Sequence, residues 1–143
     1  MSIMATSCSK DDSQPSTDIE YPTENPTDKP QQEVSTAYNE SFSPQIHFTP
    51  SRNWMNDPNG MVYSSGVYHL YYQYNTHSNE WGNMSWGHAE SKDLIHWEEK
   101  SVAMTRDALG DVFSGSAVVD KDNTAGFGAG ALIALFTSAW SFR

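Results

Sequence analysis

Alternating apolar and polar positions beyond residue 60 predict a series of short β-strands. The clearest run is Val67–Tyr74, whose aromatic and branched side chains favour a strand. Met61–Tyr63 precedes it across a Ser-Ser-Gly turn, so the two runs predict a hairpin. Because successive side chains of a strand point to opposite faces, one face is expected to carry Tyr68, Leu70, Tyr72 and Tyr74, and the other Val67, His69, Tyr71 and Gln73.

The pattern continues to the end of the chain with one interruption. A third strand is expected near Ser85–Glu90 and a fourth from His96 through Val102. After Gly110 the pattern restarts with Val112–Val119 and Ala131–Thr137. Four short strands followed by a restart are typical of a propeller blade, with a β-sandwich as the alternative on pattern alone. The last run could also form a helix, but its length and the glycines before it favour a strand.

The first third of the chain has a different composition. Residues 10–40 contain four prolines and eight acidic residues against two lysines, and Ile19 and Val34 are the only aliphatic residues larger than alanine. Such a segment cannot bury enough apolar area to offset the entropy of ordering it. The sequence therefore predicts a disordered, acidic, proline-rich linker over 10–44 and a folded part over 45–143.

The charge of the chain limits its partners. The net charge is −10 and there is no basic stripe, so we expect no nucleic-acid partner and no electrostatic attraction to an anionic membrane surface. The plain interpretation of the acid excess is solubility.

The single cysteine, Cys8, excludes an internal disulfide, and its surroundings resemble the end of a bacterial lipoprotein signal. Small residues precede the cysteine and acidic residues follow it, but only Ile3, Met4 and Ala5 stand where a signal has an apolar run of about 7–15 residues. Residues 1–9 are thus interpreted as a signal remnant, with an incidental cysteine as the alternative. Lipidation of Cys8 would attach the protein to a membrane and implies an exported protein at the cell surface or in the periplasm of a bacterium.

The stretch NWMNDPNG (residues 53–60) carries the candidate chemistry. Its Asn, Asp, Pro and Gly residues are turn formers, so a bend is the plain interpretation of Asp57. A turn made rigid by Pro58 would also aim the Asp57 carboxylate in one direction. Asn56 and Gln73 could bind sugar hydroxyls, and Trp54 and Trp81 could stack on a sugar ring. Carboxylate, amide and indole groups together are typical of a carbohydrate site.

Four motifs in order make the identification more specific: HFTPSRNWMNDPNGMVY, YHLYYQYN, WGNMSWGHAESKDLIHWEE and FSGSAV. From about His47 to Ser138 the chain resembles the start of the catalytic domain of glycoside hydrolase family 32, which includes levanases, inulinases and invertases. The resemblance implies a five-bladed β-propeller followed by a β-sandwich, with this chain as the first blade and part of the second. It implies a retaining hydrolase of fructans (levan or inulin) or sucrose, with no cofactor.

The resemblance also implies roles for individual residues. Asp57 matches the nucleophile, Asn56, Gln73 and Trp81 match residues that hold the fructose, and Trp54, Phe113 and Ser114 match the walls of that subsite. The family's acid/base glutamate lies in a Glu-Cys motif, and a third acid lies in an Arg-Asp-Pro motif. The sequence contains neither string, and Arg106-Asp107-Ala108 lacks the proline. We therefore expect this chain to be an incomplete fragment that is inactive alone.

Two other functions stay open from the sequence. One is a non-catalytic fructan-binding or surface-tether protein, and the other is a related propeller glycosidase that acts on arabinose or xylose. A reading frame that continues to the two missing motifs would favour the hydrolase. Glu98 and Glu99 are expected to lie at a solvated strand end. No metal site is predicted, because the five histidines lack ligand spacing.

Overall fold

The structure is a computed structural model that describes residues 3–6, 41–42, 44 and 46–140. The described residues form strands and loops and contain no helix. No membrane-spanning helix is therefore found in this part of the chain. The strands are β1 (Ile3–Thr6), β2 (Met55–Ser64), β3 (Val67–Asn75), β4 (Met84–Ser91), β5 (Trp97–Met104), β6 (Asp111–Asp120) and β7 (Ala131–Ala139).

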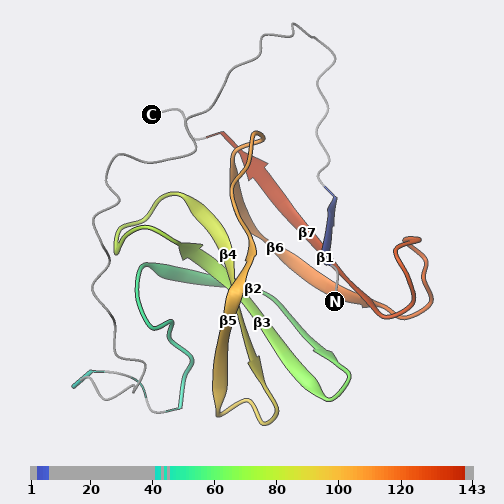
Figure 1. The fold of residues 1–143 in the computed structure, drawn as a ribbon, viewed down its shortest axis with the longest axis horizontal. Coiled ribbons are helices and arrows are strands. Elements are labelled where there is room, and N and C mark those ends of the chain that lie inside the picture. The colour runs from blue at the N-terminus through green and yellow to red at the C-terminus, as the bar shows by residue number, and fades with distance from the viewer. Residues whose placement is uncertain (1–2, 7–40, 43, 45, 141–143) are drawn as a thin grey trace, which may run out of the picture.

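Strands β2 to β5 form an antiparallel sheet in chain order (Figure 1). The predicted hairpin joins β2 to β3 through Ser65 and Gly66, whose φ angles are 52° and 85°. Two consecutive positive φ angles are the requirement of a type I′ turn, which matches the twist of the flanking strands. Four strands in sequence order agree with the predicted blade.

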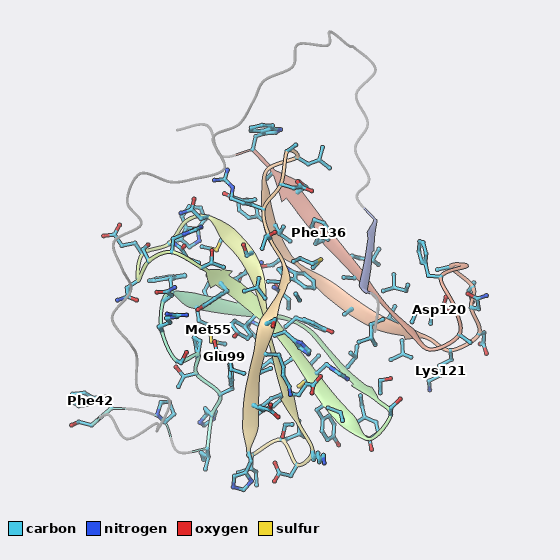
Figure 2. The ribbon with its side chains drawn as sticks, in the orientation of Figure 1. Phe42, Met55, Glu99, Asp120, Lys121 and Phe136 are labelled. Atoms are coloured by element: carbon cyan, nitrogen blue, oxygen red, sulfur yellow. The ribbon has the colours of Figure 1, made fainter. Side chains whose placement is uncertain are left out.

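The second sheet has the order β1-β7-β6 and lies beside the first in Figure 1. Strands β6 and β7 are an antiparallel hairpin, with Asp120 and Lys121 at its loop (Figure 2). Strand β1 pairs with β7 in parallel, with Ile3 opposite Leu132. The sequence predicted no strand at residues 3–6. Cys8 and the linker up to residue 40 lie outside the described residues, so the predicted signal and linker stay predictions.

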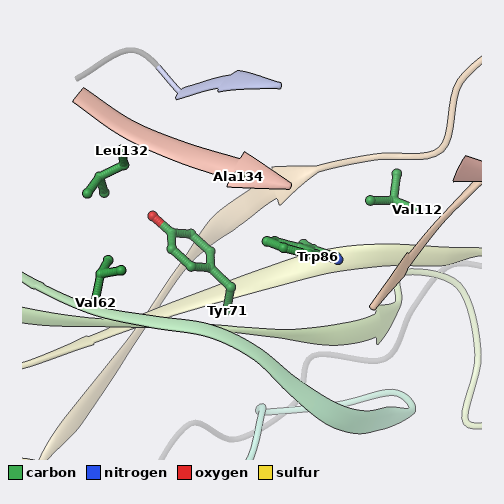
Figure 3. Close-up of a cluster of buried hydrophobic side chains, with 6 residues drawn as sticks. All are labelled: Val62, Tyr71, Trp86, Val112, Leu132 and Ala134. Carbon is green, nitrogen blue, oxygen red and sulfur yellow. The ribbon is translucent and has the colours of Figure 1, made fainter. Parts of the chain in front are cut away.

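The two sheets share one apolar core. Figure 3 shows Tyr71 and Trp86 of the first sheet facing Leu132 and Ala134 of β7. Trp86 is fully buried, and its ring packs against Phe136 at a centroid distance of 6.2 Å. Burial of large aromatic side chains contributes most to such a contact. The core therefore depends on both sheets, and it fixes the position of β6 relative to β2.

The opposite face of the first sheet is covered by the segment that precedes β2. Phe48 packs on Tyr72 and Trp97 at centroid distances of 5.0 and 6.2 Å. The Ser51 amide donates a hydrogen bond to Glu99 Oε2 at 2.9 Å. The predicted alternation is confirmed, because Tyr72 and Tyr74 are buried in this layer while Tyr71 lies in the other core.

One strand boundary differs substantially from the prediction. The first strand begins at Met55 rather than Met61, so Asp57 lies inside β2 and not in a turn before it. The ladder with β3 is interrupted on both sides of Pro58, between Asn56 and Pro58 and between Pro58 and Met61. The turn-forming residues lie at these two irregularities. Pro58 is tolerated because β2 is an edge strand of its sheet, where a missing N–H costs little.

Candidate functional site

The candidate site lies where the edge strands β2 and β6 of the two sheets approach each other. Gly60 permits the approach, because a Cβ atom built there would lie 2.3 Å from Ala117 Cβ and 2.4 Å from the Ala117 nitrogen. Both strands are irregular at this point: β6 has a register shift between Val112 and Gly115. Bulges of this kind redirect side chains and are frequent beside functional sites.

Asp57 and Ser114 project from these irregular segments and meet. Ser114 Oγ donates a hydrogen bond to Asp57 Oδ2 at 2.9 Å, and both residues are exposed. The Ser114 hydroxyl, followed by hydrogen bonding from Asn56, lowers the pKa of the Asp57 carboxyl below its usual value. Asp57 is therefore an ionised, solvent-accessible carboxylate held at a fixed place. The predicted pairing of these residues in one site is consistent with this geometry.

The side chain of Asn56 is held in one orientation by Trp54. Trp54 Nε1 donates to Asn56 Oδ1 at 2.8 Å, so the amide NH₂ is the end left to donate toward Asp57. Asn53, with φ of 68°, turns the chain just before Trp54, and asparagine tolerates this conformation better than most residues. The Trp54 indole thus orients Asn56, in addition to its predicted role as an apolar wall of the subsite.

Gln73 lies opposite Asn56 in the β2–β3 ladder and is almost fully buried. Its Nε2 donates to the carbonyl oxygen of Val112 at 3.0 Å. Trp86 Nε1 donates in the same way to the carbonyl of Phe113 at 3.1 Å. These two bonds cross from the first sheet to the irregular part of β6. Gln73 consequently positions Ser114 in addition to lying beside Asn56.

Trp81 and Phe113 form an aromatic wall at the site. Their ring centroids are 6.3 Å apart, and about half of Trp81 is exposed. The loop that carries Trp81 is held by Asn75, whose Nδ2 donates to Ser78 Oγ at 3.0 Å and to the Glu80 carbonyl at 2.7 Å. No role was predicted for Asn75 from the sequence, where it appeared only as the last residue of the motif YHLYYQYN.

Other acidic residues of the described part have structural contacts elsewhere. Glu99 accepts a hydrogen bond from the Ser51 amide, and Asp107 accepts one from the Leu109 amide. Asp93 accepts bonds from the amides of Ile95 and His96. The groups that shift the pKa of Asp57 include no second carboxylate of the described chain. The site therefore offers the ionised Asp57 carboxylate, amides, a hydroxyl, and the exposed Trp81 ring with the partly exposed Trp54 and Phe113 rings.

Comparison with known proteins gives one consistent match. The model of the glycosyl hydrolases family 32 N-terminal domain matches residues 47–142. The chain is 58% identical to a levanase of Bacillus subtilis over 106 residues, which are 72% of this chain and 16% of the levanase. It is 54% identical to an extracellular exo-inulinase of Aspergillus awamori over 109 residues, 71% of this chain and 20% of that protein.

Solved structures give the same result. An exo-inulinase of Aspergillus awamori matches with a TM-score of 0.61 and 55% identity, covering 64% of this chain and 19% of that one. A fructofuranosidase variant of Schwanniomyces occidentalis, complexed with fructosylnystose, matches with a TM-score of 0.67 and 40% identity over 77% and 23% of the two chains. The chain thus spans about a fifth of these relatives. The fold prediction is confirmed: the described part is all-β and corresponds to one part of a five-bladed β-propeller.

Proposed function

Because the chain belongs to glycoside hydrolase family 32, we propose that it forms the first part of a retaining hydrolase of β-fructosyl linkages in fructans or sucrose. The observation that carries the proposal is the Asp57–Ser114 pair on two facing, irregular edge strands. The relatives named above include a levanase and an exo-inulinase, which supports fructans as the substrate class.

Asp57 is proposed as the nucleophile. Its lowered pKa keeps the carboxylate ionised at neutral pH, which a nucleophilic carboxylate requires. An Asp57 oxygen would form a bond to the anomeric carbon while the bond from that carbon to the leaving oxygen breaks and the leaving oxygen takes a proton. Water would then cleave the fructosyl-enzyme ester and restore the carboxylate. Ser114 and Asn56 fix the carboxylate for this attack.

The neighbouring side chains are proposed to bind the fructosyl unit. Asn56 is adjacent to the nucleophile, and Gln73 lies opposite Asn56 on β3. The half-exposed ring of Trp81, together with Phe113, offers an apolar surface to one face of the sugar. Trp54 would complete the wall on the β2 side. In such a site, amides usually bind the sugar hydroxyls and aromatic rings usually contact the apolar face of the sugar.

The proton donor is proposed to lie outside this chain. A retaining glycosidase needs a second carboxyl group about 5–5.5 Å from the nucleophile. No acidic residue in the described part is among the groups that shift the pKa of Asp57. A chain with the nucleophile alone cannot protonate the leaving oxygen, so the 143-residue chain is expected to release no fructose by itself.

The test compares the product of the complete reading frame with its Asp57→Asn variant, which keeps the shape of the side chain and removes the nucleophile. Fructose release from levan, inulin and sucrose should fall by a factor on the order of 10⁴ or more. Full activity of the variant would exclude the assignment of Asp57. A complete product that binds levan but hydrolyses none of the three sugars would favour the non-catalytic tether instead.

We also propose that the protein is exported and attached to a membrane through Cys8. The acidic segment 10–40 would then hold the folded part away from the membrane. One relative is named as an extracellular enzyme, which supports export. A Cys8→Ala variant should move from the membrane fraction to the soluble fraction of the cell or the medium. An unchanged distribution would contradict attachment through this residue.

A further inference from the structure

A second cluster of ionisable side chains lies on β3 and β4, away from the Asp57 site. It consists of His69, His88 and Glu90, and His69 is four residues from Gln73, or roughly 13 Å along the strand. His69 is buried and the other two are partly buried. The sequence predicted no metal site because the histidines lack ligand spacing along the chain. Strand pairing brings them together instead, since His69 lies directly opposite Glu90.

The three ligand atoms form a triangle of the size that a small metal ion requires. His69 Nδ1 is 3.1 Å from His88 Nε2 and 3.4 Å from Glu90 Oε1, and His88 Nε2 is 3.9 Å from Glu90 Oε1. The circle through three points at these separations has a radius of about 2.0 Å, which is the length of Zn–N and Zn–O bonds. An ion at the centre would reach all three atoms without movement of the backbone.

Surrounding groups hold these ligands in place. Lys100 Nζ lies 3.3 Å from Glu90 Oε2, which leaves Oε1 facing the two imidazoles. Tyr71 stacks on the His88 ring at a centroid distance of 4.7 Å and an interplanar angle of 17°. Such contacts behind the ligands are what orients a carboxylate and an imidazole at a metal.

The cluster is also accessible from solvent. Glu90 is partly exposed and lines an open cavity of about 370 Å³ together with Asp93, His96 and Glu98, so an ion can approach the cluster from the Glu90 side.

We propose that His69 Nδ1, His88 Nε2 and Glu90 Oε1 bind one divalent transition-metal ion, with Zn²⁺ as the best fit. Two nitrogen donors and one oxygen donor suit Zn²⁺ and disfavour Mg²⁺ and Ca²⁺, which prefer oxygen ligands. A water molecule from the cavity would fill the fourth position. The proton of the His69–His88 hydrogen bond has to leave the ligand nitrogen that carries it, either to the other nitrogen of that ring or to solvent. The ion would cross-link β3 and β4.

The test is a titration of the EDTA-treated chain with ZnCl₂, followed by calorimetry, and with CoCl₂, followed by visible absorption. We expect one ion per chain, an increase in the unfolding temperature, and displacement of Co²⁺ by Zn²⁺. Glu90→Gln keeps the size of a partly exposed side chain and should weaken Zn²⁺ binding by about tenfold or more. His96→Gln, at an exposed histidine outside the cluster, is the matched control and should bind as the unchanged chain does.

Three results would overturn the proposal: no binding at millimolar Zn²⁺, equal affinity of Glu90→Gln and the unchanged chain, or loss of binding in His96→Gln alone. Circular dichroism of each variant establishes that it is folded. The shifts of the imidazole ¹⁵N signals would name the coordinating nitrogens, and Nδ1 of His69 and Nε2 of His88 are expected. None of these measurements depends on hydrolytic activity, so they stand apart from the proposed fructosidase.

Discussion

The Asp57–Ser114 site and the His69–His88–Glu90 cluster are built in opposite ways. The first joins residues 57 positions apart, on strands of two different sheets, and it is open to solvent. The second joins strands of one sheet, with its two histidines 19 positions apart, and it is largely buried. The site between the sheets therefore depends on how they dock, whereas the histidine cluster depends on the register of β3 and β4 and on Lys100 of β5, all within one sheet. Substitutions that disturb the docking of the sheets should therefore change the Asp57–Ser114 site more than the histidine cluster.

The largest effect is expected from Trp86→Ala. Trp86 is fully buried between the sheets and donates to the Phe113 carbonyl, so its truncation leaves a cavity and an unpaired carbonyl. The free energy of unfolding should fall by about 3–5 kcal/mol, measured by urea denaturation. Trp86→Phe retains most of the ring volume and should cost clearly less. A loss of less than about 1 kcal/mol in Trp86→Ala would mean that the sheets are not held together by this core.

Gly60→Ala should affect the two sites differently. The new methyl group meets the Ala117 side chain and backbone, so β2 and β6 have to move apart. We expect a loss of about 1–3 kcal/mol in unfolding free energy and a weakened Asp57–Ser114 hydrogen bond. Zn²⁺ affinity of the same variant should be unchanged, because the atoms nearest to a Cβ at Gly60 belong to Ala117 and not to any of the three cluster residues. Equal damage to both sites would contradict their independence.

A smaller effect is expected from acid on the histidine cluster. The pKa of His88 is about 4 in the folded chain against 6.5 for an ordinary histidine, through burial first and then the neighbouring His69 charge, with Lys100 adding to it and Glu90 opposing it. Because the pKa of His88 is lower in the folded chain than in the unfolded chain, the neutral His88 contributes fully to folding stability above pH 6.5. This stability is lost as the pH falls toward 4. The unfolding temperature should decline over this interval, and His88→Gln should make the decline shallower. An identical decline of the unfolding temperature in His88→Gln would mean that other titratable groups cause it.

The smallest effect is expected from Ser114→Ala. Ser114 is the largest cause of the lowered pKa of Asp57, so its removal should raise that pKa toward the ordinary value. Carboxyl ¹³C chemical shifts measured against pH would detect the change. The stability that the lowered pKa contributes is present above the ordinary pKa and is lost as the pH falls through the folded one, so the substitution removes it at neutral pH. The loss in unfolding free energy should be small, because both residues are exposed and water screens their contact. A pKa of Asp57 unmoved by the substitution would mean that the hydroxyl does not bind the carboxylate in solution.

Local pattern was sufficient to predict most of the strands. The predicted run Val67–Tyr74 corresponds to β3 over Val67–Asn75, and Ala131–Thr137 corresponds to β7 over Ala131–Ala139. Side-chain alternation and β-propensity act within a few residues, so they are visible in the sequence. The start of β2 was missed for the opposite reason: Asp57, Pro58 and Gly60 have turn propensities, and an edge strand with two bulges overrides them.

The residues of the candidate site were predicted from family motifs, but the contacts between them could not be. Nothing local in the sequence places Ser114 on Asp57 or the Trp86 N–H on the Phe113 carbonyl, because both bonds depend on how two sheets dock. The histidine cluster was missed because its ligands alternate on one face of two paired strands. Its signal is a histidine on β3 opposite a His-Ala-Glu triplet on β4, which is readable only once the register is known.

The tip of the first hairpin offers a place to attach something to this domain. Ser65 and Gly66 are exposed, and a Cβ atom at Gly66 would contact nothing within 4 Å. The tip begins eight residues from Asp57 along the chain, or roughly 26 Å for a regular strand. A short peptide tag inserted between these residues would therefore attach the domain to a solid support at the end away from Asp57, so that levan or inulin can be passed over the immobilised chain.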